Sequence, residues 1–265
     1  MPPTSFLHLD TGAWGHSILR VARSWWFMLH FGAIVLVMAL SPSTYGKTHR
    51  ATTAQYIYTS TWQVLPWFTA MAALLSLVLI RVVVVTALSY GLSQYALQMV
   101  VRVLVLELIP LSAAMFVALR AGLAFNAGAT DITQPASTVQ RPLSLQRLRL
   151  ELVPRVLASA FAVLTLAMVS SMIALVLAYL TVYGLSPWGL PGYTRTVGQV
   201  FDLAVTLGFI LKTVFFSLAV AVVPMAASLE APRQPLNLDT VQPGAVRLFL
   251  VLLLIEAASL AVKYI

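Results

Sequence analysis

Long apolar stretches separated by short polar ones dominate this chain. Five of them reach the roughly 20 residues that a helix needs to cross the hydrocarbon core of a bilayer. They run from about Leu65 to Leu88, Tyr95 to Ala127, Val156 to Tyr183, Leu207 to Ser228 and Ala245 to Val262. The second stretch is long enough to need a tilt or a kink, and Pro110 removes one backbone hydrogen bond within it. The pattern predicts an all-α integral membrane protein with five transmembrane helices.

A shorter apolar stretch, residues 18–40, precedes these five, after an N-terminal stretch 1–17 that is expected to be irregular. It begins with Arg20 and Arg23, followed by two tryptophans, which is typical of a helix lying at the membrane interface. Its apolar part, Trp25 to Leu40, covers only ~24 Å, less than the roughly 30 Å of the core. An interfacial or half-inserted helix is favoured, with a sixth span as the alternative. The expected organisation is a tail and interfacial helix over 1–50 and a five-helix transmembrane domain over 51–265.

The most polar stretch is residues 128–153, and its basic residues include Arg141, Arg147 and Arg149. Basic residues accumulate in the cytoplasmic loops of membrane proteins, so this loop is expected to be cytoplasmic. The N-terminus then lies inside and the C-terminus outside. Residues 185–195 are rich in Pro and Gly and are expected to form an external, turn-rich connection. A short amphipathic helix is expected after it, over residues 196–206.

Composition excludes several classes of function. Only 9% of the residues are charged, against about a quarter in soluble domains. The net charge of +8 comes from scattered basic residues, which argues against nucleic-acid binding. The absence of cysteine excludes disulfides, thiol catalysis and Cys-ligated metals. The run Gly46–Thr48 lacks the earlier glycine of a phosphate-binding loop. The histidines all lie before residue 50, far from the acids of the spans, so no catalytic, metal or cofactor site is expected.

Charged side chains inside the apolar stretches are the candidates for function, because a charge in hydrocarbon costs at least roughly 2.5 kcal/mol. Such groups normally face the interior of the helix bundle and pair with one another. Lys212 has two candidate partners, Glu107 and Glu256, and either pair would lock the helices together or help to open a cavity. Arg81 and Arg102 face the interior or extend to an interface. The full set is Arg81, Arg102, Glu107, Arg120, Lys212 and Glu256.

Four short motifs, in order, resemble those of the MlaE/YrbE permeases, the membrane subunits of MCE-associated ABC lipid transporters. The E-L-G-P and G-R-x-G motifs of that family correspond to Glu107–Pro110 (ELIP) and Leu119–Gly122 (LRAG). The V-P-R-x-x-A motif corresponds to Val153–Ala158, and K-[ST]-x-x-F corresponds to Lys212–Phe216. The resemblance covers roughly residues 20 to 265.

The resemblance implies a homodimer in the bacterial inner (cytoplasmic) membrane that moves phospholipid or a related lipid to or from a periplasmic MCE protein. A separate cytoplasmic ABC ATPase would hydrolyse ATP, and this chain would have no catalytic site and no cofactor. An auxiliary cytoplasmic subunit is left open. The candidate lipid-binding residues on the first span are Leu77, Arg81, Val84 and Tyr90. The candidate ATPase-coupling residues in the polar loop are Gln134, Arg141, Arg147 and Arg149.

The chain departs from the family at Ile109 and Leu119, where the motifs carry glycine. It also departs at Thr133–Val139, where the ATPase-docking helix of the family carries an acidic residue. These differences favour the alternative of a non-transporting membrane scaffold or a divergent subunit of such a complex. A third class, an intramembrane enzyme acting on lipids, is disfavoured because the spans contain no plausible catalytic set.

Overall fold

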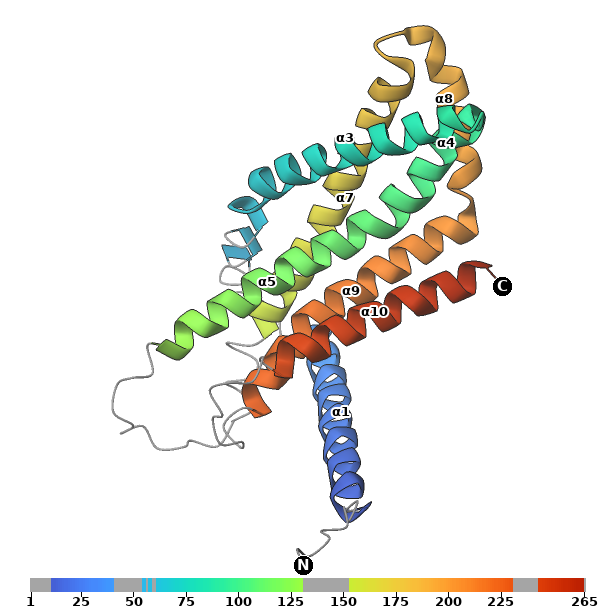
Figure 1. The fold of residues 1–265 in the computed structure, drawn as a ribbon. Coiled ribbons are helices and arrows are strands. Elements are labelled where there is room, and N and C mark those ends of the chain that lie inside the picture. The colour runs from blue at the N-terminus through green and yellow to red at the C-terminus, as the bar shows by residue number, and fades with distance from the viewer. Residues whose placement is uncertain are drawn as a thin grey trace, which may run out of the picture.

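The computed structural model describes residues 11–40, 54–55, 57–58, 61–130, 153–230 and 243–264. The regular structure within these residues is helical (Figure 1). Five helical segments are long and apolar enough to cross a membrane: Leu65–Ser89, Tyr95–Arg120, Pro154–Tyr183, Leu203–Ala227 and Gly244–Lys263. The predicted all-α architecture with five spans is therefore confirmed, and the chain is a multi-pass membrane protein.

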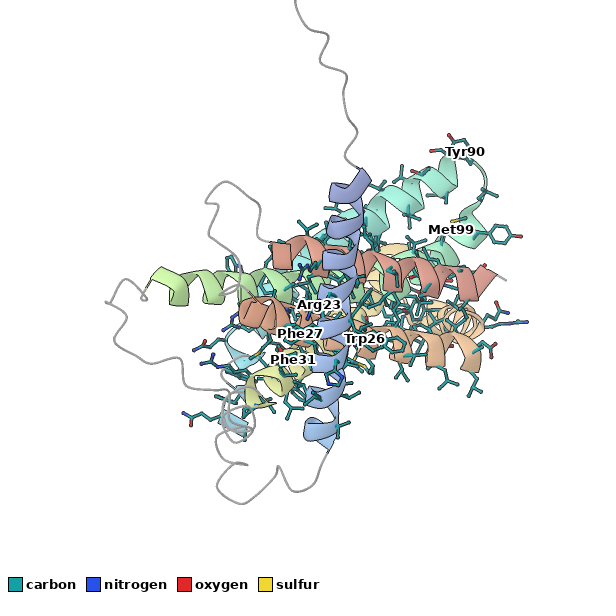
Figure 2. All side chains as sticks on the ribbon, turned by 90° about the horizontal axis from the view of Figure 1, so that it is seen from below. Arg23, Trp26, Phe27, Phe31, Tyr90 and Met99 are labelled. Atoms are coloured by element: carbon teal, nitrogen blue, oxygen red, sulfur yellow. The ribbon has the colours of Figure 1, made fainter. Side chains whose placement is uncertain are left out.

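Helix α1 (Thr11–Leu40) extends away from the bundle of the other long helices (Figure 1). It packs mainly against α9 through a buried stripe of Met28, Phe31 and Val35. Trp26 and Phe27 lie beside that stripe and are exposed (Figure 2). The apolar part, Trp25–Val37, is too short for a span, which agrees with the interfacial helix expected from the sequence. The helix begins at Thr11, so residues 11–17 are helical and the expectation that they are irregular is wrong.

Helices α3 (Leu65–Ser89) and α4 (Ser93–Val100) form a hairpin whose turn contains Gly91. Gly91 has a φ of 70°, a backbone conformation that glycine adopts without steric cost. Helix α3 buries one narrow stripe at four-residue spacing, Phe68, Ala72, Ser76 and Ile80, and packs against α7. Most of the remaining surface of α3 is apolar and exposed. Its outer face is therefore available to lipid or to another subunit.

The second span consists of three helical segments, α4, the π-helix η2 (Val101–Leu108) and α5 (Ile109–Thr130). The backbone N–H of Ile109 donates to the carbonyl of Leu104, five residues earlier. A proline in an α-helix clashes with the carbonyl four residues before it, and the wider π-helical turn before Pro110 relieves that clash. The predicted disturbance at Pro110 is thus a π-helical segment of eight residues, which contains Glu107.

Helix α7 (Val153–Tyr183) is central, because it packs against α3, α5 and α9. Its buried positions are mostly small or aliphatic, which lets neighbouring backbones approach closely; they include Ala162, Val163, Ala167, Ala174 and Ala178. Helix α9 (Leu203–Glu230) lies between α7 and α10 (Pro243–Tyr264). Helix α10 packs on α9 at the side of the bundle and leaves most of its own surface exposed (Figure 1).

The connection after α7 is helical, with a 3₁₀ turn η5 (Pro187–Gly189) followed by α8 (Leu190–Val200). The expected helix over 196–206 is therefore misplaced. Proline is tolerated in the first turn of a helix, where its missing N–H has no partner to lose, and Pro191 lies there in α8. The helix ends at Val200, where the chain changes direction before α9.

Three tyrosines fix α8 against the end of α7. The Tyr193 hydroxyl donates to the Leu175 carbonyl at 2.8 Å. The Tyr193 ring packs edge-on against Tyr179 and Tyr183, with centroids 5.2 and 6.4 Å away. Burial raises the pKa of Tyr193 to about 12, so the hydroxyl remains a donor at ordinary pH. The connection is therefore a packed element and not an open loop.

Candidate functional site

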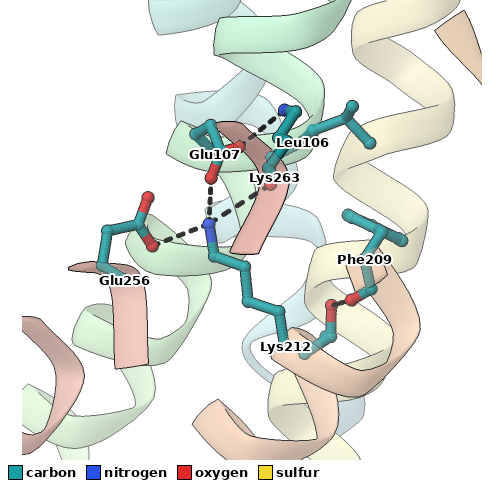
Figure 3. A network of polar contacts seen from close by, with 7 residues as sticks. Leu106, Glu107, Phe209, Lys212, Glu256 and Lys263 are labelled. Carbon is teal, nitrogen blue, oxygen red and sulfur yellow. Dashed lines mark hydrogen bonds and ion pairs between the residues drawn. The ribbon is translucent and has the colours of Figure 1, made fainter. Parts of the chain in front are cut away.

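Charged side chains from three helices meet inside the bundle and form an ion-pair cluster, which we define as Glu107, Lys212, Glu256 and Lys263 (Figure 3). Lys212 of α9 lies between the two acids, in contact with the carboxylate of Glu107 on η2 and 2.7 Å from Oε2 of Glu256 on α10. Its side chain is only 2% exposed. The sequence left open which acid pairs with Lys212, and the structure brings both to it.

Lys263 is the member of the cluster that the sequence interpretation missed. Its Nζ lies 2.9 Å from Oε1 of Glu107, so this carboxylate is shared by two lysines. Lys263 stands seven residues after Glu256, two helical turns along the same face of α10, and this spacing was the available signal. With two acids and two bases, the ion-pair cluster has no net formal charge.

The backbone of η2 also takes part in the cluster. In an α-helix, the Leu106 carbonyl would accept from residue 110, but Pro110 has no N–H. The Lys212 Nζ lies 3.5 Å from this carbonyl, at the outer limit of a hydrogen bond (Figure 3). The same ammonium lies 5.6 Å from the ring centroid of Phe216, within the range of a cation–π contact. Lys212 is thus surrounded by electron-rich groups from its own helix and two others.

The cluster has the chemistry of a junction between helices. Buried ions in a membrane protein must be paired, and each pair here joins two different helices. Within the described ranges, no group of three or more His, Asp or Glu side chains is placed to hold a metal ion. Separation of η2, α9 and α10 would break every pair at once. The cluster therefore either holds these helices together permanently or forms and breaks as they close and separate.

The candidate lipid-binding residues of the first span lie along the outer side of the α3 hairpin. Leu77 and Arg81 are exposed one turn apart on α3, and Tyr90 is exposed at the turn into α4. Val84 is half-buried and packs against the cluster of core residues around Ile80. The exposed three do not meet the ion-pair cluster, so these two sets of predicted residues form separate sites.

Of the remaining predicted residues, Arg120 belongs to neither of these sites. Arg120 is half-buried on α5, thirteen residues beyond Glu107, and is not among the partners of Glu107. The candidate coupling residues all fall outside the described residues: Gln134, Arg141, Arg147 and Arg149.

A scan against protein-family models matches residues 53–262 to the model described as "Permease MlaE". The match covers most of the chain, including the first four spans and all but the last residue of the fifth. A search of curated proteins found no significant match.

Proposed function

Because the chain belongs to the MlaE permease family, we propose that it is the membrane-spanning subunit of an MCE-type ABC transporter that moves phospholipid or a related lipid. The observation that carries this proposal is the five-span helical body that the family model matches over residues 53–262. The ion-pair cluster inside that body supports the proposal, because ion pairs between helices can break when the helices separate and form again when they close.

In this proposal, two copies of the chain sit in the bacterial inner membrane and enclose a lipid between them. The apolar outer face of α3 suits this role, because a lipid site needs an apolar surface with a few polar groups for the headgroup. Leu77, Arg81, Val84 and Tyr90 are the residues that we assign to it. A cytoplasmic ABC ATPase supplies the energy, and a periplasmic MCE protein exchanges the lipid.

The transport cycle is proposed to alternate between a state in which the ion-pair cluster is intact and a state in which its pairs are broken. When it is closed, Lys212 holds η2 and α10 against α9, and Lys263 holds α10 against η2. When ATP hydrolysis moves these helices, the four charges need new partners, and lipid headgroups or water entering between the helices can supply them. The chain itself is assigned no catalytic step.

The test is co-purification followed by reconstitution. The full-length chain, tagged and solubilised in mild detergent, is expected to retain an ABC ATPase and an MCE protein. In proteoliposomes, this complex is expected to transfer fluorescent phospholipid in an ATP-dependent manner, and Glu107→Arg is expected to abolish transfer without preventing assembly. Transfer that persists in Glu107→Arg would remove the cluster from the mechanism. A folded chain that retains neither partner would favour the scaffold alternative.

A further inference from the structure

The buried core of the bundle consists of two apolar clusters, one after the other along the helices. On α3, Ala72 belongs to the first cluster and Ile80 to the second. On α7, Ala167 belongs to the first cluster and Ala174 to the second. Each of these pairs is separated by about two helical turns, so the two clusters occupy different levels of the same bundle.

A layer of polar side chains separates the two clusters on these helices and on α9. On α9, the polar residues lie between Phe209, which packs against the second cluster, and Phe216, which belongs to the first. The side chains of the layer are buried, between 2% and 7% exposed, and we define this polar layer as Ser76, Ser170, Ser171, Lys212 and Thr213. Polar groups removed from water need hydrogen-bond partners, so the partners of this layer decide what it can bind.

Two hydroxyls of the polar layer lack a partner. Among the described residues, the Ser170 and Ser171 hydroxyls are buried and make no hydrogen bond. The Thr213 hydroxyl, in contrast, donates to the Phe209 carbonyl of its own helix at 2.7 Å. The other serines and threonines of α7 also donate to carbonyls of their own helix: Ser159, Thr165 and Thr181. A buried hydroxyl without a partner destabilises the fold, so Ser170 and Ser171 favour the binding of a small polar molecule.

The surroundings of Ser170 and Ser171 indicate which molecule binds. Helix α7 packs closely against its neighbours through small buried residues, and Ala167 and Ala174 lie one turn away on either side of the serines. A molecule held between such closely packed helices must be small, and it must hydrogen-bond to a hydroxyl. Water meets both requirements, and buried water characteristically binds polar groups that lack other partners. We propose that the polar layer binds water at Ser170 and Ser171, in the interior of the bundle.

Water in this layer lies at the level of the ion-pair cluster, because Lys212 belongs to both. When the pairs of Lys212 with Glu107 and Glu256 break, the ammonium needs other hydrogen-bond acceptors, and water inside the bundle supplies them. This role adds to the proposed function. The water site itself does not depend on transport, since it is a property of the chain alone.

The test follows the hydrogen–deuterium exchange of a single thiol. The natural chain has no cysteine, so the S–H stretching band in the infrared spectrum of a variant reports on one site. Ser170→Cys and Ser171→Cys replace a hydroxyl by a thiol of similar size, and either variant is sufficient if the other fails to fold. Val163→Cys and Val101→Cys are matched controls, because both valines are fully buried, one in each apolar cluster, and cysteine is smaller than valine. The full-length, detergent-solubilised variants are transferred to D2O and the loss of the band is recorded.

The thiols at positions 170 and 171 are expected to exchange roughly tenfold faster than those of the controls, or more, at the low band frequency of a hydrogen-bonded thiol. That result supports water in the polar layer. Slow exchange at the same low frequency would identify a backbone carbonyl as the partner and overturn the proposal. Slow exchange at the frequency of a free thiol would show a dry core, which overturns it as well.

Equally fast exchange in all four variants would show that the whole bundle opens, and would overturn a water site confined to the polar layer. Each of these outcomes concerns the chain alone. Failure of the proposed function is seen separately, as the absence of ATP-dependent lipid transfer by the wild-type complex.

Discussion

Lys212 shows how a single buried charge depends on its neighbours. Removing an ammonium from water costs several kcal/mol, and the attraction to Glu107 and Glu256 offsets that cost only while both acids stay close. The cation–π contact with Phe216 and the Leu106 carbonyl add to this environment. Lys263 is more exposed, at 18% against 2% for Lys212, and contacts Glu107. The two lysines of the cluster should therefore differ in their importance for stability.

Lys212→Met is expected to lower the free energy of unfolding by about 3 kcal/mol, because it leaves Glu256 buried without a base. Lys263→Met is the matched control and should cost about 1 kcal/mol or less, since Glu107 still pairs with Lys212 in this variant. Denaturant titration of the detergent-solubilised protein measures both. Equal losses for the two variants would contradict the central role of Lys212.

Gly189 is a second position where the local structure depends on a single residue, because there is no room for a side chain there. A Cβ built there would lie 2.6 Å from the Tyr183 ring, so Gly189→Ala is expected to displace that ring and its contact with Tyr193. The expected loss is about 1–3 kcal/mol. Gly198→Ala, on the same external connection, has open space around the new methyl group and should be neutral or slightly stabilising. Thermal unfolding of the two variants, monitored by tyrosine and tryptophan fluorescence, makes the comparison. Similar Tm values for the two variants would show that the Tyr183 ring can move aside without loss of stability.

At the scale of elements, the sequence predicts the positions of the spans, because these depend on the length of apolar runs. It does not predict features that depend on contacts between helices. The spans beginning at Leu65, Tyr95 and Ala245 agree with the structure to within a residue at their starts, because runs of apolar residues are sufficient to define them. The pairing of Lys212 was expected because so few charges lie in the spans. The π-helix before Pro110 and the role of Lys263 depend on how three helices meet, and no local pattern records that. The α8 boundaries were missed because Pro191 was read as a turn residue and not as a helix start.

The π-helix gives a prediction of its own. Pro110→Ala restores an N–H that can donate to the Leu106 carbonyl, so η2 is expected to relax towards an α-helix and turn Glu107 away from Lys212. Lipid transfer by the reconstituted complex should fall at least tenfold, and the Tm should fall as well, because buried Lys212 loses one of its two acids. Pro66→Ala is the control, since Pro66 lies in the first turn of α3 and interrupts no helical hydrogen bond. Undiminished transfer in Pro110→Ala would mean that the π-helical form is not required.

At the scale of the whole molecule, the predicted orientation of the spans in the membrane can be tested directly. The described helices fix which spans are neighbours, and the arginine-rich loop 128–153 sets the expected direction through the positive-inside rule. Because α7 is a candidate span, its two ends at Val153 and Tyr183 are expected on opposite sides of the membrane. One labelled position on each side is enough to decide.

The natural chain contains no cysteine, so single introduced cysteines give clean labels. Trp188→Cys, at a position 93% exposed in η5, is expected to react with a membrane-impermeant maleimide added to cells whose outer membrane has been permeabilised. Ser137→Cys in the polar loop should react only after the inner membrane is opened. The reverse pattern would invert the proposed orientation and place the MCE-facing and ATPase-facing ends on the wrong sides.

The charge balance of the ion-pair cluster has an electrical consequence. Moving one elementary charge across a membrane potential takes about 2.3 kcal/mol per 100 mV. Because Glu107, Lys212, Glu256 and Lys263 sum to zero, the cluster can shift as a body with almost no work against the potential. If α10 alone moves away, it carries one acid and one base with it and leaves the neutral pair of Lys212 and Glu107 behind. Helix rearrangement at this junction should therefore proceed equally well in energised and de-energised membranes.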